Sequence, residues 1–368
     1  MPPAGLMTGS PAPVGRPPIT TPRDGRRAEG SPLARQPWLG LVGGLVFVVP
    51  FAVPLAFGVG GAEGSLFVLG PLATFALPVV AVIAFWWEDW PGTRLRSAWA
   101  GWADTALVIV GAVALTVAGQ AVTARPDLAG IFDPGAGPEH AATFPATMPL
   151  AGAAFVVMLQ LTLACERWPL DRLDRTWSGI LALITAWAVA LLLTRTLVAS
   201  GVVGGADFGA LMVTTGMWQT VLFVVLQGWP LDRIESRAPR LLANNAAVAV
   251  GALLTYAALS APAGLGADTI SAVCGCVIAG GLLVGILFEG RPRPVRRWRA
   301  LTLVAVVSAA LFIVLTRFAG TVLWQRATAS DWVAHAALNA IGLPVILHVG
   351  IGRRWPFPRI WNERKDTP

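Results

Sequence analysis

Long apolar segments recur along the chain, and each is about as long as a helix that crosses a membrane. A hydrocarbon layer of about 30 Å is crossed by roughly 20 helical residues. Ten segments of this kind lie at approximately 38–59, 67–87, 102–123, 147–165, 178–199, 208–227, 242–262, 269–288, 300–323 and 332–351. The composition agrees, because 55% of the residues are hydrophobic and 13% are charged. The sequence therefore predicts an all-α polytopic membrane protein with about ten transmembrane helices, and excludes a water-soluble globular protein.

Short polar segments flank this membrane domain, which we place at residues 37–352. Residues 1–36 are rich in Pro, Gly, Ser and Arg and lack apolar periodicity, so they cannot form a core. We expect them to be a disordered cytoplasmic tail, and residues 353–368 to be a second cytoplasmic tail.

The basic residues predict the orientation of the chain. The two tails and the loops after every second segment hold 23 of the 27 Lys and Arg residues. Because basic loops stay on the cytoplasmic side, both termini should be cytoplasmic. The net charge of +7 then reflects orientation and contact with the lipid bilayer, and no nucleic-acid partner is expected. Lys365 is the one lysine beside the many arginines, as a GC-rich bacterial genome would produce, so we expect a bacterial plasma membrane.

A short motif repeats after the even-numbered segments. The pattern Trp-Pro-x-x-Arg begins at Trp90, Trp168, Trp229 and Trp355, and Arg291-Pro292 with Arg296 is a decayed copy. A second landmark, Leu-Thr, follows at a nearly constant distance in four of the units. The spacing predicts five tandem helical hairpins with the same orientation in the membrane. Their approximate ranges are 38–87, 102–165, 178–227, 242–288 and 300–351.

Five hairpins of one orientation resemble the architecture of the tellurite-resistance and slow-anion-channel family, in which ten helices form a quasi-fivefold pore. The resemblance is one of topology, and no site residue is carried over from it. It implies a pore as the expectation for this chain.

Three polar side chains occupy equivalent positions near the non-cytoplasmic ends of odd-numbered segments. Arg195, Tyr256 and Arg317 each follow a Leu-Thr landmark. If the odd-numbered helices surround a common axis, these donors form a partial ring that suits an anion. The alternative is structural, because Arg195 and Arg317 can instead pair with Asp207 and Asp331 and hold each hairpin together. Both interpretations stay open.

Other polar residues lie within or beside the apolar segments. Asp104 is a candidate for a solute pathway, although buried polar groups more often bond neighbouring helices. Gln160, Gln219, Asn244 and Asn245 carry the same two interpretations. His140, with Asp133 and Glu139 nearby, and His335 form a candidate metal site at the outer face.

The sequence contains no nucleotide-binding or hydrolase motif that we can identify, and an enzymatic activity is not expected. Our first hypothesis is a small-solute or ion transporter or channel, with anions included. The alternatives are a non-transporting subunit or anchor of a redox or lipid-facing enzyme complex, with one metal or haem, and a structural membrane protein without a small ligand. The sequence does not identify a cofactor, a solute, an energy source or an oligomeric state.

Overall fold

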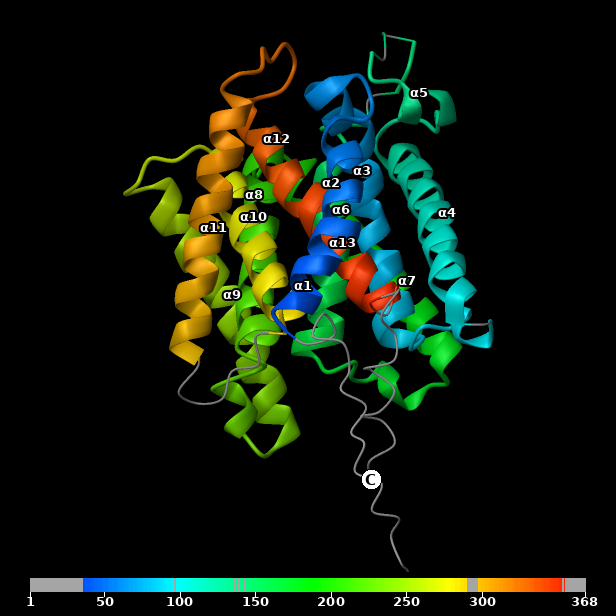
Figure 1. Cartoon of the computed structure of the whole chain (residues 1–368), viewed down its shortest axis with the longest axis vertical. Helices are drawn as coiled ribbons and strands as arrows, with labels where there is room; N and C mark the ends of the chain where they lie inside the picture. The colour runs from blue at the N-terminus through cyan, green and yellow to red at the C-terminus, as the bar shows by residue number, and fades with distance from the viewer. Residues whose placement is uncertain are drawn as a thin grey trace, which may run out of the picture.

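A computed structural model of the chain describes residues 36–95, 97–135, 137, 139–141, 143–289, 297–352 and 354. Every regular element in these ranges is helical, and the helices stand side by side as one bundle (Figure 1). The all-α prediction is therefore confirmed. The two predicted tails lie outside the described residues, except for Gln36 and Arg354.

Nine of the helices in the described residues are long and apolar enough to cross a membrane. They are Trp38–Phe57 (α1, η2, α2), Gly61–Trp86 (α3, η3), Trp99–Thr123 (within α4, Ser97–Thr123), Arg175–Val198 (α7, η7), Gly205–Val225 (α8, η8), Arg237–Ser260 (α9), Ala267–Leu287 (α10, η10), Arg297–Ala319 (α11) and Ala329–Ile351 (α12, η12, α13, η13). The protein is therefore an integral membrane protein. A shorter apolar helix, Met148–Ala164 (α6, η5), occupies the place of the fourth predicted segment.

Helices that alternate along the chain form an inner and an outer set. In the most apolar stretches of α3, α8, α10 and the α12–η13 helix, between 44% and 78% of the residues are buried. In the five long helices that alternate with them, the buried share is between 11% and 28%. Helix α6 belongs to the inner set, because Leu150, Ala151, Ala153 and Ala154 are almost fully buried.

The inner helices form a closed ring in chain order. Helix α3 packs against α6, α6 against α8, α8 against α10, and α10 against α12, which returns to α3. The outer helices α4, α7, α9 and α11 pack mainly against the inner helix that precedes each of them, and α2 packs against η12 and α3. The inner set is thus the even-numbered one. The odd-numbered helices therefore do not surround the axis, so the condition for the anion ring is not met, and the packing does not establish the predicted hairpins as units.

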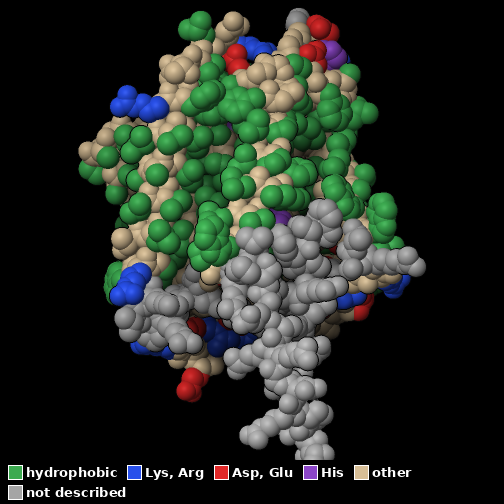
Figure 2. Space-filling model, viewed as in Figure 1, with side chains coloured by type: hydrophobic (Ala, Val, Ile, Leu, Met, Phe, Trp, Pro, Cys, Tyr) green, Lys and Arg blue, Asp and Glu red, His purple; other side chains and the backbone are tan. Residues whose placement is uncertain are grey.

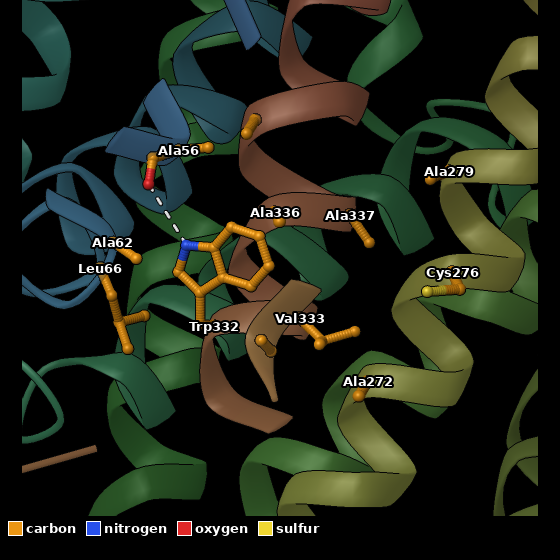
Figure 3. Packing of buried hydrophobic residues seen from close by; sticks show 12 residues of the cluster. Ala56, Ala62, Leu66, Ala272, Cys276, Ala279, Trp332, Val333, Ala336 and Ala337 are labelled. Atoms are coloured by element: carbon orange, nitrogen blue, oxygen red, sulfur yellow. Dashed lines mark hydrogen bonds between the residues drawn. The ribbon is translucent and has the colours of Figure 1, made fainter. Parts of the chain in front are cut away.

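Small side chains let the inner helices approach one another closely. Helix α10 contains Gly275 and Gly281, and a Cβ atom at Gly281 would lie 2.7 Å from Thr220 Cγ2 of η8, which continues the inner helix α8. At the other side of α10, Cys276 and Ala279 pack in a cluster around Trp332 of α12 (Figure 3). The Trp332 indole is fully buried and donates to the Ala56 carbonyl at 3.2 Å.

Charged side chains lie mainly at the two ends of the bundle, and an apolar surface separates them (Figure 2). We call the end with loops 87–95, 165–174 and 226–236 the basic face, and the other end the opposite face. Near the start of α3, an inner helix, Glu63 accepts from the backbone N–H groups of Gln325, Arg326 and Ala327 at the opposite face.

The five inner helices end at the basic face in one kind of backbone turn. In each turn, a backbone N–H donates to the carbonyl five residues earlier. The five bonds join Trp87 to Val82, Cys165 to Gln160, Leu226 to Val221, Phe288 to Leu283 and Gly352 to Leu347. The residue that follows is left-handed in four of them, with φ of 50° at Glu88, 50° at Glu166, 54° at Gln227 and 48° at Glu289.

Candidate functional site

A polar contact joins each neighbouring pair of inner helices. Within a membrane such contacts hold helices together, because an unpaired polar group in hydrocarbon is costly. The contacts join Trp86 to Thr162 at 2.9 Å, Gln160 to Gln219 at 2.6 Å, Thr214 to Cys274 at 3.6 Å, Thr269 to Ser330 at 3.5 Å and Thr74 to Asn339 at 3.3 Å.

Three amides form a chain from the ring to an outer helix. Gln219 of α8 is fully buried, and its Nε2 donates to Gln160 Oε1 and to the Val156 carbonyl at 3.0 Å. Gln160 Nε2 in turn donates to Asn245 Oδ1 of α9 at 2.8 Å, and Asn245 Nδ2 donates to the Leu241 carbonyl at 2.7 Å. The amides predicted to be buried polar groups therefore bond neighbouring helices, and they fix the orientation of the Gln160 side chain.

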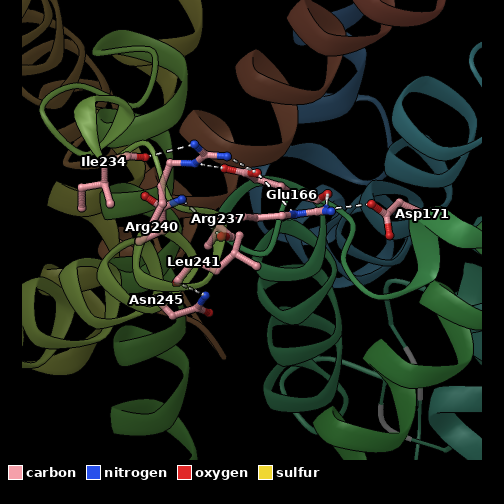
Figure 4. Close-up of polar contacts among 9 residues, drawn as sticks. Glu166, Asp171, Ile234, Arg237, Arg240, Leu241 and Asn245 are labelled. Carbon is pink, nitrogen blue, oxygen red and sulfur yellow. Dashed lines mark hydrogen bonds and ion pairs between the residues drawn. The ribbon is translucent and has the colours of Figure 1, made fainter.

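Two ion pairs continue this chain toward the basic face (Figure 4). Arg240 Nε and Nη2 donate to the two carboxylate oxygens of Glu166 at 2.6 and 2.9 Å. Arg237 Nη2 donates to Asp171 Oδ2 at 2.7 Å. The hydrogen bond from Arg240 lowers the pKa of Glu166, and the bond from Arg237 lowers the pKa of Asp171. Both carboxylates therefore stay ionised, and each neutralises an arginine.

A cavity of about 240 Å³ lies beside the amide chain, and it is partly open. Its wall comes from α6, η5, α7, α8 and α9, and we call it the α7–α9 groove. Its lining residues are Val156, Val157, Gln160, Leu193, Leu211, Met212, Thr215, Val248, Ala249, Ala252 and Leu253. Gln160 and Thr215 are the two polar residues in a lining that is otherwise apolar.

Two glycines leave space on the inner side of the ring. Leu150 and Ala154 of α6 pack in the cluster around Ala190 of α7, and a helix turns about 100° per residue. Gly152 therefore points away from α7, and a Cβ atom there would meet one atom within 4 Å, Met212 Cβ at 3.8 Å. On α8, Phe208 packs in the cluster with α6 and α7, and Ala210 packs with Ile270 of α10. Gly209 lies between these two residues and faces away from Leu211 and Thr215 of the α7–α9 groove, although Met212 of the groove is only about 60° from it around the helix. A Cβ atom at Gly209 would meet nothing within 4 Å.

The structure does not bring the three predicted ring residues together. Arg195 is exposed on η7 (Thr194–Val198) and donates to the Val122 carbonyl of α4 at 2.9 Å. Arg317 is exposed in the last turn of α11. Tyr256 donates its hydroxyl to Asp207 Oδ1 at 2.8 Å, so this carboxylate binds the phenol across the α8–α9 boundary. All three lie on outer helices.

The aspartates proposed to pair with those arginines have other roles. Asp331 closes a capping box with Thr328 at the start of α12 (Ala329–His335), because each side chain accepts from the backbone of the other.

Asp104, the candidate for a solute pathway, is fully buried, and its Oδ1 accepts from the Gly92 backbone N–H at 2.9 Å. A Cβ atom at Gly92 would lie 2.1 Å from Asp104 Oδ2, so Asp104 holds the loop after α3 against α4.

The two histidines proposed for a metal have separate partners. His140 contacts Asp127 in the loop after α4, with 2.9 Å between Nδ1 and Oδ2. His335 is buried between helices, with Nε2 3.0 Å from the Leu55 carbonyl and Nδ1 3.3 Å from Asn339 Nδ2. Within the described ranges, no group of three or more His, Cys, Asp and Glu side chains is arranged to hold a metal ion.

The pair of Asp127 and His140 predicts a pH dependence of the loop. Backbone hydrogen bonds from Gly130 and Ala141, and the contact with His140, hold the pKa of Asp127 well below its usual range. The same contact raises the pKa of His140. The His140 contribution is therefore present below its unfolded pKa of about 6.5 and lost as the pH rises through the folded pKa. The Asp127 contribution is lost only in acid.

We expect the Ala141 backbone N–H to exchange faster at about pH 8.5 than at about pH 6, after correction for intrinsic exchange. Hydrogen exchange followed by mass spectrometry measures this rate. In His140→Gln the corrected rate should no longer change between the two pH values. An unchanged pH response in that variant would show that His140 does not control the loop.

Arg354 is almost fully buried, and the sequence analysis did not identify it as a structural residue. Its Nη1 and Nη2 donate to the carbonyls of Leu287 and Ile286 at 3.1 and 2.7 Å, and Nη2 lies 3.1 Å from Glu289 Oε1. Arg354 therefore binds the end of α10–η10. A signal was present, because Arg354 and Arg167 occupy the same place in the repeated motif.

No protein family, curated protein or solved structure matches the chain.

Proposed function

We propose that the protein transports a small solute or ion across a bacterial plasma membrane, through the ring of inner helices. The observation that carries this proposal is the open space at Gly209, supported by Gly152 on the neighbouring inner helix. A Cβ atom at Gly209 would have no neighbour within 4 Å, although α8 belongs to the ring. We place the entrance of the pathway at these two glycines.

The entrance lies toward the opposite face. Gly209 is in the second turn of α8, which begins at Gly205, and Gly152 is close to the start of α6 at Met148. Both helices run from the opposite face to the turns at the basic face. Water can therefore reach the space between them without crossing the apolar middle of the bundle.

Ten crossings and a fivefold repeat fit this pathway. The short helix Met148–Ala164 ends in the same backbone turn as the four longer inner helices. We therefore include it as the tenth crossing, and we propose that the chain is five hairpins of one orientation. Because arginines are in excess at the basic face, we propose that this face and both termini are cytoplasmic.

Arg195 and Arg317, which the sequence suggested as part of an anion site, contribute positive charge near the proposed entrance. Arg195 and Arg317 lie in the last turns of outer helices that end at the opposite face, and Tyr256 is bonded to Asp207. Exposed positive charges near an entrance raise the local concentration of anions. Asp207, Asp268 and Asp331 lie at the same face, so the charges there do not by themselves favour anions over cations, and the experiment below compares the two.

The experiment is a flux measurement on the purified chain in liposomes. We expect release of at least one member of a panel of small anions, cations and neutral solutes to be faster than in protein-free liposomes, by about tenfold or more, since a protein pathway replaces the hydrocarbon barrier. Rates equal to those of protein-free liposomes for every solute would contradict the proposal. Release of anions and release of cations are compared in the same panel.

A further inference from the structure

The α7–α9 groove faces the lipid and lies at membrane depth. The apolar stretches of α7–η7 and α9, which border it, are 17% and 22% buried, and the exposed side chains on them include Leu192, Val250 and Leu254. Hydrocarbon is the medium that contacts these surfaces. The groove is therefore a recess in a lipid-facing wall, and its volume of about 240 Å³ must be filled from the membrane.

The two polar residues of the groove retain hydrogen-bonding capacity. One N–H of Gln160 Nε2 is used by Asn245, and an amide nitrogen carries a second. Thr215 donates its hydroxyl proton to the Leu211 carbonyl at 2.8 Å, so its oxygen can still accept. The groove thus offers one fixed N–H donor at Gln160, which matches a carbonyl oxygen.

The depth of Gln160 agrees with the carbonyl region of a lipid. Gln160 precedes Glu166, at the basic face, by six residues, which is at most about 9 Å along the helix axis, because η5 and the turn after it rise less per residue than an α-helix. The rest of the lining extends from there toward the opposite face and is apolar except for Thr215. A lipid of the basic-face leaflet would therefore place an ester carbonyl at Gln160 and an acyl chain against Met212, Val248 and Ala252.

Charge does not select the headgroup at this site. Arg240 and Arg237 stand above Gln160, but Glu166 and Asp171 already neutralise them. An anionic headgroup would therefore gain little from either arginine, because the positive charge of each is already balanced by a carboxylate. The attraction of the groove for a lipid must therefore come from contacts with the acyl chain and from the hydrogen bond to the ester carbonyl.

We propose that the α7–α9 groove binds one acyl chain of a glycerolipid, with its ester carbonyl hydrogen-bonded to Gln160 Nε2 and with no preference for headgroup charge. This inference does not depend on the proposed transport activity. It assigns the groove to a resident lipid of the basic-face leaflet.

Native mass spectrometry of the purified chain tests this assignment. The chain is exchanged into detergent with limiting phosphatidylethanolamine or phosphatidylglycerol, and the fraction that retains one lipid is measured. Ala249→Phe fills the groove from its exposed rim, where the ring points into the recess. Val250→Phe is the matched control, because Val250 is the next residue, is exposed, and does not line the groove.

We expect the wild-type chain and Val250→Phe to retain one lipid, and Ala249→Phe to retain at least about fivefold less, as the recess is occupied. The two lipids should be retained equally. Gln160→Leu should also lower retention, and an unchanged unfolding temperature of Ala249→Phe shows that the loss does not come from unfolding. Equal retention by wild type and Ala249→Phe would overturn the proposal. So would a strong preference for phosphatidylglycerol, or the loss in Ala249→Phe of a bound apolar molecule other than a lipid.

Discussion

Arg354→Met should destabilise the protein by about 3 kcal/mol, because the substitution removes the donor of the Ile286 carbonyl and the partner of the Glu289 carboxylate in a mostly buried place. The Leu287 carbonyl keeps its second donor, Gln36 Nε2, at 3.1 Å. Arg354 is 5% exposed and Glu289 is 25% exposed. The Leu287 and Ile286 carbonyls end the η10 turn, and the Arg354 guanidinium binds them and Glu289 together. Methionine keeps an unbranched apolar side chain and removes the guanidinium with its donors and charge.

Arg167→Met is the matched control for this substitution. Arg167 has the same place in its turn, since the backbone N–H groups of Arg167 and Arg354 each donate at 2.9 Å to the carbonyl six residues earlier. Both residues are left-handed, with φ of 63° and 58°. Arg167, however, is 44% exposed and lies 3.9 Å from Glu88.

We therefore expect Arg167→Met to cost less than about 1 kcal/mol, as exposed ion pairs do. Reversible unfolding in detergent measures the free energy of both variants, and each variant changes the net charge equally. Equal losses in the two variants would show that burial of Arg354 is not the cause, and that the turn or the charge alone sets the cost.

The membrane helices were predictable because the bilayer imposes their length and composition. The fourth segment was expected at 147–165, and the structure has Met148–Ala164. The repeated motif likewise predicted where the inner helices end. Local rules were sufficient for both, since each helix bonds its own backbone and the basic residues gather in the loops at one end.

The identity of the inner helices was not predictable from hydropathy. The mean hydropathy of the apolar stretch is 2.4 in α10–η10, an inner helix, and 2.3 in α11, an outer one. Lipid and protein interior are both apolar, so a membrane helix needs similar side chains in either place. Glycines do not separate the two sets either, because the outer helix α4 contains Gly101, Gly111 and Gly119.

The partners of polar residues depended on packing across the bundle. From the sequence we proposed Arg195 as the partner of Asp207, and in the structure Asp207 accepts from Tyr256 instead. Gln160 and Asn245 are 85 residues apart, and the amide chain that joins them exists only because α6 and η5 pack beside α9. Spacing in the sequence does not contain this information.

The pathway through the inner ring has its most direct test at Gly209. In Gly209→Cys the thiol points into the open space, and a positively charged methanethiosulfonate reagent can reach it from the opposite face. The wild-type chain is one control, because Cys274 and Cys276 are buried and Cys165 is partly buried. Leu323→Cys is the second, because Leu323 is 92% exposed in the loop after α11 and far along the chain from α8.

The test measures solute flux from liposomes before and after the reagent is added to the same sample. We expect flux through Gly209→Cys to fall at least about tenfold once the thiol is modified, since a bulky charge then occupies the pathway. Flux through the wild-type chain and through modified Leu323→Cys should not change. Complete modification of Gly209→Cys with unchanged flux, or a thiol that the reagent cannot reach, would contradict a pathway through the inner ring.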